Sequence, residues 1–224
     1  IRKLKWHPDK LYTLPLNDEK ALEVANKGFL AGVFQLDGGS AARVSSEIQI
    51  DSFDDVVAAS ALCRPGPADW VGIYRANKTD EQSFEQYLNL MHPAAGEIVK
   101  KTFGILLYQE QVMRMAREMA GLSWPDVHKL RKGVTDKIGL DPQKGGPWRQ
   151  EWSAKFVGGC KENSVSTEEA LSWWAAIQTH GGYSFNRCLT GDTMVMRGAA
   201  GINGGNEITL ERLYQNQEAR NVDG

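Results

Sequence analysis

The sequence has 224 residues, of which 42% are hydrophobic, and its formal net charge at pH 7 is −2. A chain of this length and composition can bury a hydrophobic core, so we exclude an intrinsically disordered protein and expect one or two globular domains. The small net charge excludes a uniformly basic nucleic-acid coat protein. Any contact with a polyanion must therefore come from local clusters of Lys and Arg.

The cysteines and the apolar segments indicate a cytoplasmic protein. Cys63, Cys160 and Cys188 are an odd number without CxxC spacing, which argues against a disulfide framework and for a reducing compartment. No apolar run is long enough to cross a bilayer, and residues 1–10 lack the apolar core of a signal peptide, so we expect no membrane contact. The chain begins at Ile1, and its last segment is expected to be only part of a domain, so we interpret the chain as a piece of a longer protein.

Up to residue 187 the pattern predicts a mainly helical chain, because capping residues precede apolar positions at helical spacing. A short apolar run at residues 33–36 predicts a strand followed by a polar turn, and residues 141–148 predict a mobile loop. The expected helices are residues 17–27, 51–64, 79–91, 104–123, 124–134, 147–163 and 166–180.

From residue 188 the pattern changes to that of a short β-rich segment. Alternating residues predict a strand at 192–198, a glycine-rich connector follows at 199–207, and a short helix is expected at 208–219. A segment of this length cannot bury a core alone, so we expect either disorder or an exposed hairpin there.

The basic stretch "LRKGVTDK" offers Arg131, Lys132 and Lys137 as three cations that could converge on a triphosphate. The alternative is a helix C-terminus that compensates its own dipole. In "ALCRPGP", Arg64 ends a helix and is held by two prolines, which suits a phosphate or template contact, although an ordinary Pro-Gly turn explains it too.

The stretch "GGYSFNR" combines Tyr183 and Phe185, which could stack on a base or sugar, with the polar side chains of Asn186 and Arg187. Aromatic residues that simply belong to a core are the alternative.

The acidic residues and histidines predict no metal site. The pairs Asp54–Asp55 and Glu168–Glu169 lie in first helical turns, where carboxylates act as caps and complement the helix dipole. The four histidines have no ligand spacing among themselves or with cysteine.

Six blocks of the chain, in order, resemble the successive motifs of the bacterial replicative DNA polymerase III alpha subunit, the C-family polymerases. They are "GVFQLDGGSA", "DSFDDVVAASALCRPGP", "TFGILLYQEQVMRMAREMAGLS", "KLRKGVTDK", "KFVGGCKENSVSTEEA" and "GGYSFNR". The resemblance implies the fingers region, which closes on the incoming deoxynucleotide (dNTP) above the template–primer DNA. It also implies that the rest of the polymerase chain is a partner.

The same resemblance suggests site residues. "IRKLKW" resembles the stretch that follows a catalytic aspartate in the family, which implies that the aspartates holding Mg²⁺ precede Ile1 and that this fragment alone is inactive. Basic or polar positions of the family motifs fall on Arg64, Arg131, Lys132, Lys137, Asn186 and Arg187.

Two of the basic motifs depart from the family pattern. The family usually has "RRAMGKK" where this chain has "RKGVTDK", so that Asp136 replaces an expected lysine. It has "FNK" where this chain has "FNR", which keeps the charge at Arg187 but changes its geometry.

The segment "CLTGDTMV", which interrupts the last family motif, resembles the first block of an intein. This resemblance implies that Cys188 is a nucleophile whose thiolate attacks the carbonyl of Arg187 and forms a thioester, without any cofactor. A polymerase insertion loop that happens to begin on a cysteine is the alternative. No histidine follows His180, and the chain does not end in His-Asn, so two explanations stay open. Either the gene piece is truncated, or this is the N-terminal half of a split intein whose complementary C-terminal fragment leads to a Ser.

We therefore expect a fingers region at residues 1–187 and an N-terminal intein segment at 188–224. The rival from another class is a stand-alone helical nucleic-acid-binding module without catalysis. A purely structural helical domain is the third interpretation.

Overall fold

The computed structural model describes residues 14–64, 67–136 and 138–180, residue 187, and two strands at residues 194–197 and 206–209. The chain divides into two compact units, Leu16–Arg187 and the remaining residues. Among the described helices, none is both long and apolar enough to span a membrane.

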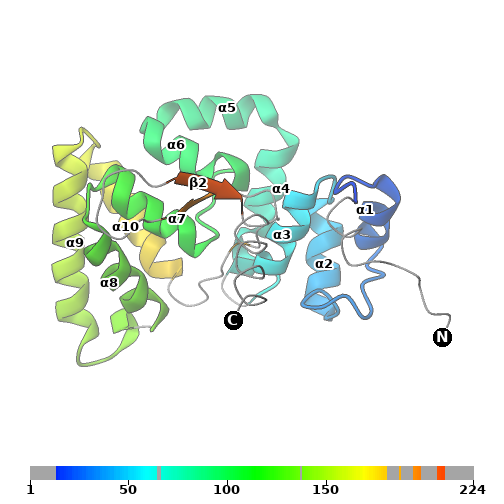
Figure 1. Cartoon of the computed structure of the whole chain (residues 1–224), viewed down its shortest axis with the longest axis horizontal. Helices are drawn as coiled ribbons and strands as arrows, with labels where there is room; N and C mark the ends of the chain where they lie inside the picture. The colour runs from blue at the N-terminus through cyan, green and yellow to red at the C-terminus, as the bar shows by residue number, and fades with distance from the viewer. Residues whose placement is uncertain are drawn as a thin grey trace, which may run out of the picture. The chain divides into compact units, whose positions relative to one another are not determined.

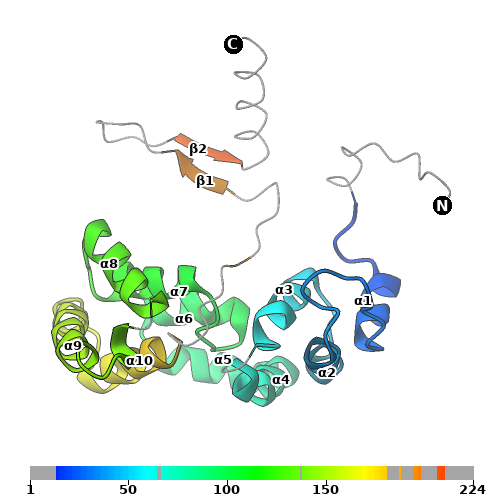
Figure 2. The same cartoon turned by 90° about the horizontal axis from the view of Figure 1, so that it is seen from below.

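The unit Leu16–Arg187 is helical, as expected. Figures 1 and 2 show its helices in a row, with α1–α3 at one end and α8–α10 at the other. The α-helices are α1 (Glu19–Asn26), α2 (Gly39–Ile48), α3 (Phe53–Leu62), α4 (Val71–Thr79), α5 (Glu81–Leu90), α6 (Pro93–Val99), α7 (Gln109–Arg114), α8 (Trp124–Thr135), α9 (Gly145–Glu162) and α10 (Thr167–His180). Short 3-10 turns, η2 (Pro67–Trp70), η3 (Lys100–Thr102) and η5 (Ile138–Leu140), and a π-helical turn, η4 (Met115–Met119), connect them.

Local capping chemistry explains why most expected helices are confirmed. Asp18, Ser52, Asp80 and Ser123 each accept a backbone N–H in the first turn of α1, α3, α5 and α8, respectively. Ser52 forms a reciprocal capping box with Asp55, which confirms the capping role expected for that carboxylate. Helices α1, α3, α5 and α10 begin one or two residues later than the pattern predicted, whereas α8 begins at the predicted residue and α9 begins two residues earlier.

Three expectations in this unit are wrong. Residues 33–36 form no strand: residues 34–36 lie in turns, where Gln35 adopts a left-handed φ of 64° and Phe34 is 86% exposed. The expected polar turn after them is helix α2, which buries Val44 and Ile48. The expected loop at 141–148 is shorter, since Asp141 accepts two backbone N–H groups in a turn and α9 begins at Gly145. Helices α4 and α6 were not expected.

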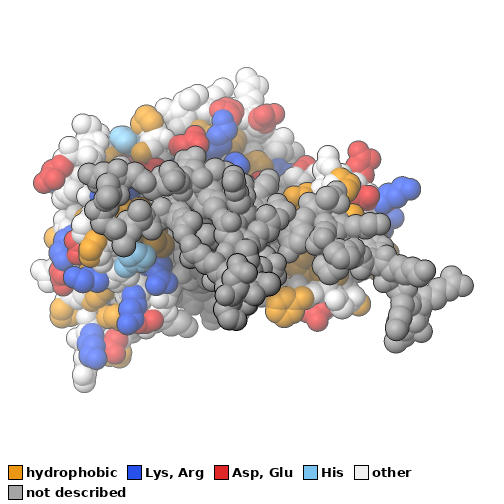
Figure 3. Space-filling model, in the orientation of Figure 1, with side chains coloured by type: hydrophobic (Ala, Val, Ile, Leu, Met, Phe, Trp, Pro, Cys, Tyr) orange, Lys and Arg blue, Asp and Glu red, His pale blue; other side chains and the backbone are white. Residues whose placement is uncertain are grey.

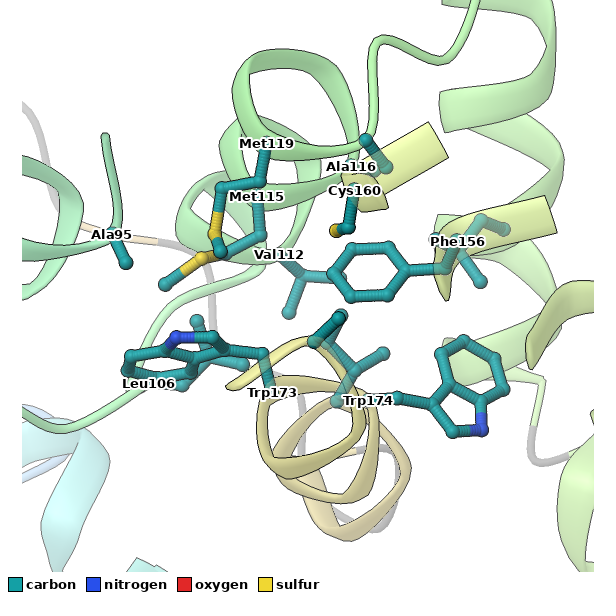
Figure 4. Close-up of a cluster of buried hydrophobic side chains, with 14 of the residues drawn as sticks. Ala95, Leu106, Val112, Met115, Ala116, Met119, Phe156, Cys160, Trp173 and Trp174 are labelled. Carbon is teal, nitrogen blue, oxygen red and sulfur yellow. The ribbon is translucent and has the colours of Figure 1, made fainter. Parts of the chain in front are cut away.

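Two hydrophobic cores stabilise this unit. The first draws on α1–α4 and includes Val44, Leu62 and Tyr74. The second draws on α6–α10, and Figure 4 shows Met115 and Met119 of the π-helical turn on the side of Trp173, with Phe156 on the side of Trp174.

The segment 105–108 joins the two cores and corrects a further expectation. The sequence predicted a helix from residue 104, but residues 105–107 are non-helical and α7 begins only at Gln109. Leu106 packs in the second core, whereas its neighbours Ile105 and Leu107 pack in the first. An extended backbone sends successive side chains to opposite sides, so this segment can serve both cores at once.

Gln111 supplies the hydrogen bonds that this non-helical backbone lacks. Its side-chain oxygen accepts the N–H groups of Leu107 (2.8 Å) and Tyr108 (2.9 Å). Its amide nitrogen donates to the Ile98 carbonyl (3.0 Å) and the Thr102 hydroxyl (2.7 Å). One buried amide therefore satisfies polar groups from three segments.

The second unit contains a pair of strands. β1 (Met194–Arg197) pairs antiparallel with β2 (Asn206–Thr209), with Val195 opposite Ile208. The strand expected at 192–198 is confirmed for 194–197, and the pairing agrees with the hairpin alternative. The helix expected from residue 208 is wrong at Ile208 and Thr209, which belong to β2, and residues 210–219 lie outside the described part.

Candidate functional site

Arg187, the last residue of the helical unit, is held by three contacts. Its guanidinium Nη2 donates to Asp54 Oδ1 on α3 at 2.8 Å, and its backbone N–H donates to Glu110 Oε2 on α7 at 3.1 Å. The guanidinium carbon also lies 6.0 Å from the ring centroid of Tyr108, which is within cation–π range. Residue 187 is thereby fixed against the junction of the two cores.

These residues line a cavity of about 520 Å³ within the unit Leu16–Arg187. Its wall combines four cations, three carboxylates, an aromatic ring and the buried Gln111 amide. The lining residues are Asp54, Glu97, Ile98, Lys100, Lys101, Thr102, Tyr108, Glu110, Gln111, Arg114 and Arg187. This volume is in the range of small-ligand sites.

The cations differ in how far they are already neutralised. Arg114 forms a two-pronged pair with Glu118 at 2.7 and 3.0 Å, and these hydrogen bonds raise the pKa of Arg114. Lys100 lies 3.3 Å from Glu85. Lys101 is exposed and has no ion pair with any residue in the described part of the chain, so its charge is available to an anion.

A buried network beneath α3 fixes the helix that presents Asp54. Asp55 is 2% exposed and accepts hydrogen bonds from Tyr74 (2.8 Å), Lys78 (2.7 Å) and Ser52 (2.8 Å). Burial by itself raises the pKa of Asp55, but the hydrogen bonds from Lys78, Asp51, Ser52 and Tyr74 outweigh it and bring the pKa below its usual value. The pKa of Tyr74 is raised, first by burial and then by the Asp55 charge.

The expected basic residues do not all gather at this cavity. Arg64 follows the C-cap of α3, as expected, and Arg131 and Lys132 lie on α8, but none of these three is among the lining residues. Arg131 is half-buried, and its Nη1 donates to Gln109 Oε1 at 3.4 Å, whereas Lys132 is exposed. Lys137, Asn186 and Cys188 lie outside the described residues, so convergence of Arg131, Lys132 and Lys137 stays a prediction.

In the second acidic pair, Glu168–Glu169, the carboxylate of Glu169 has a structural role. Glu169 accepts the N–H of His92 (2.8 Å) and the indole N–H of Trp173 (3.3 Å), and thereby ties α10 to the start of α6. Within the described residues, no group of three His, Cys, Asp or Glu side chains is placed to hold a metal ion.

Sequence reasoning missed most of the cavity wall. Lys100 and Lys101 belong to no recognised basic motif, and the sequence pattern placed Tyr108, Glu110 and Gln111 in an ordinary amphipathic helix. The only available signal was a glutamine at a position where the helical pattern required an apolar residue, because a buried amide implies backbone groups that need partners.

Comparison with known proteins matches most of the chain to one family. The family model of the bacterial DNA polymerase III alpha subunit finger domain matches residues 2–163. DNA polymerase III subunit alpha of Halalkalibacterium halodurans is 33% identical over 187 residues, which cover 84% of this chain and 16% of the relative. The same subunit of Aquifex aeolicus is 31% identical over 176 residues (78% and 14%), and that of Mycobacterium leprae is 33% identical over 185 residues (79% and 15%).

The chain thus spans only 14–16% of the length of these relatives. The family model, in contrast, covers most of the helical unit. The chain belongs to the family of bacterial DNA polymerase III alpha subunit finger domains.

Proposed function

We propose that this chain is the fingers region of a cytoplasmic replicative DNA-directed DNA polymerase, where it handles the incoming dNTP and the template–primer DNA. The observation that carries the proposal is the family match over residues 2–163. The cavity beside Arg187, of about 520 Å³, supports it through Lys101, which is the one of its four lining cations without an ion pair within the described residues.

In this proposal the chain provides positioning and charge rather than the reacting groups. Lys101 and Arg187 would neutralise phosphate oxygens at the cavity, and Arg64, Arg131, Lys132, Lys137 and Asn186 would add contacts in the closed enzyme. Phosphoryl transfer also requires Mg²⁺ held by carboxylates. The described residues offer no such ligand set, so we assign the metal to aspartates elsewhere in the polymerase, and we expect this fragment alone to be inactive.

Primer extension by the restored full-length enzyme tests this role. Arg131→Ala and Lys101→Ala should each raise the KM for dNTP, because each removes a cation from the nucleotide's surroundings. Lys20→Ala, on the exposed face of α1, is the matched control and should leave KM unchanged. If Arg131→Ala and Lys101→Ala both behave like Lys20→Ala, the helices have only a structural role.

We further propose that residues 188–224 are the N-terminal part of an intein. The sequence "CLTGDTMV" and the position of Cys188 directly after the family motif support this proposal. The Cys188 thiolate would attack the Arg187 carbonyl carbon. A C–S bond forms, the peptide C–N bond between Arg187 and Cys188 breaks, and the freed α-amino group of Cys188 takes up the proton that the thiol released. Ligation would then require a complementary C-terminal fragment that supplies the asparagine and a downstream Ser.

Mixing experiments test the proposed splicing activity of residues 188–224. The chain is combined with a complementary C-terminal intein fragment that carries a tagged flank beginning with Ser, and ligated product is followed by mass spectrometry. We expect a product that joins Arg187 to the tag, no product from Cys188→Ala, and an unchanged yield from Cys63→Ala. Equal ligation by wild type and Cys188→Ala would refute this assignment and leave the polymerase proposal untouched.

A further inference from the structure

Helix α8 presents an aromatic and basic face to solvent. Residues four apart lie on the same side of a helix, so Trp124, His128 and Lys132 form one stripe. The opposite side is buried, as Val127, Leu130 and Val134 pack into the second core. The stripe is therefore the outward face of a helix whose orientation is fixed by its core contacts.

Trp124 is an unusually exposed indole. It is 53% exposed, its ring centroid lies 6.2 Å from that of His128 at an interplanar angle of 37°, and the Arg117 guanidinium carbon lies 6.0 Å from it. Arg117 is held in place by its hydrogen bond to the Leu122 carbonyl (2.9 Å). Two rings and a planar cation are thus grouped on the exposed surface of the protein.

Cations outnumber carboxylates on this stripe, which holds Arg117 and Lys132 against one carboxylate, Asp136 at the C-cap of α8. Lys132 has no carboxylate partner within the described residues, and Lys129 has only a distant one, Asp126 at 3.9 Å. Asp126 is already engaged by the Ser123 hydroxyl at 2.9 Å and lies on the side of α8 away from Trp124. Figure 3 shows Lys and Arg side chains gathered over the part of the molecule where Figure 1 places α8 and α9.

We propose that Trp124, His128, Lys132 and Arg117, here called the α8 platform, bind single-stranded DNA. Stacking of unpaired bases on Trp and His is sequence-tolerant, and Lys and Arg attract the backbone. Trp124 and Lys132 are eight residue steps apart, about 12 Å along the helix axis, so the stripe is long enough to contact more than one nucleotide of a strand. The occupant is single-stranded because a paired base offers no free face to the indole.

This inference deepens the proposed function, since it assigns the unpaired template strand to a particular face of the fingers. A protein partner would suit an apolar surface, but here cations flank the exposed ring, and the complementary surface is a polyanion with aromatic bases.

Fluorescence anisotropy of the whole chain with labelled oligo-dT, at low salt, tests the platform. Trp124→Ala should weaken binding about 5- to 150-fold, and Trp124→Phe should retain most of the affinity because a ring remains. Lys132→Gln should reduce the slope of log K against log salt by about 0.7. Leu90→Ala removes another exposed apolar side chain, on α5, and should change nothing.

Quenching of tryptophan fluorescence by unlabelled oligo-dT provides a second readout, which does not require the Trp124→Ala variant to fold. Wild type should be quenched on titration and Trp124→Phe should be quenched less, while a duplex of equal length should quench neither. Equal quenching of both proteins, or equal oligo-dT affinity of folded Trp124→Ala and wild type, would overturn the platform. Such a result would leave the fingers assignment standing, because that assignment is tested by primer extension in the full enzyme.

Discussion

Arg187 and Asp54 lie 133 positions apart in the sequence, yet the arginine Nη2 is 2.8 Å from the aspartate Oδ1. This ion pair and the hydrogen bond from the Arg187 backbone N–H to Glu110 tie the last residue of the helical unit to α3 and α7. Arg187, whose carbonyl we propose as the acyl donor in splicing, therefore also lines the proposed nucleotide cavity.

The Arg187–Asp54 pair should contribute modestly to stability. The two side chains are 34% and 51% exposed, so water screens their attraction. A double-mutant cycle with Arg187→Ala and Asp54→Ala, measured by urea unfolding, should give a coupling energy of about 0.2–1 kcal/mol. High salt should diminish it, and Arg187→Lys should retain part of it. A coupling energy that salt does not change would contradict the ion-pair interpretation.

The buried Lys78–Asp55 pair should matter more. Lys78 is 12% exposed and Asp55 is 2% exposed, so Lys78→Met leaves a carboxylate buried without its cation and should lower the free energy of unfolding by about 3 kcal/mol. Lys27→Met, which breaks the exposed pair with Glu23, should leave the unfolding midpoint unchanged. Equal midpoints for the two variants would show that the Asp55 network does not stabilise α3.

The same network predicts an acid dependence. Because the folded pKa of Asp55 lies below its unfolded value of about 3.9, its stabilisation is complete above that pH and is lost as the pH falls through the lower, folded pKa. Asp55→Asn should therefore lose less stability than wild type between neutral and strongly acidic pH. Thermal unfolding across this pH range measures the difference, and parallel curves would contradict the assignment.

Gln111 should be the most sensitive polar residue of the core junction. Gln111→Met leaves the N–H groups of Leu107 and Tyr108 without their acceptor and should lower the free energy of unfolding by roughly 2–6 kcal/mol, at 1–3 kcal/mol for each group. Gln86→Met, at an exposed position of α5, should change it by less than about 0.5 kcal/mol. Denaturant unfolding of the two variants makes the comparison, and similar losses would mean that water replaces the amide.

Gly158 and Gly159 of α9 should respond oppositely to the same substitution. A Cβ on Gly159 would lie 2.0 Å from the Ala120 carbonyl oxygen, directly after the π-helical turn, whereas a Cβ on Gly158 meets nothing within 4 Å. Gly159→Ala should therefore destabilise the protein by about 1–3 kcal/mol or more, and Gly158→Ala should stabilise it by about 0.5–1 kcal/mol. Melting temperatures that shift in the same direction would show that α9 moves freely away from the π-helical turn.

Cys160 should be inert towards thiol reagents in the folded protein. Burial, followed by the charge of Glu169, raises the pKa of Cys160 to about 11, so at pH 7 its thiolate fraction is on the order of 10⁻⁴. Mass spectrometry after brief iodoacetamide treatment should find Cys160 unmodified until guanidinium is added. Modification without denaturant would mean that the second core opens locally.

Local chemistry allowed the sequence by itself to determine much of this protein. Helices α3, α8 and α10 follow from caps and 3.6-residue periodicity, because those signals act within one or two turns of the chain. The ordered motifs likewise indicate the fingers family, and the family match confirms it.

Only the tertiary structure decided the rest, because the deciding contacts join residues far apart in the chain. Residues 105–107 belong to the apolar run that predicted a helix, yet they are non-helical because two cores need side chains on opposite sides of one segment. Residues 33–36 look like a strand, but no partner strand lies beside them within the described residues, and turns form instead. The cavity wall follows from the same cause, since α3, α6, α7 and Arg187 meet there through packing and ion pairs that no local pattern encodes.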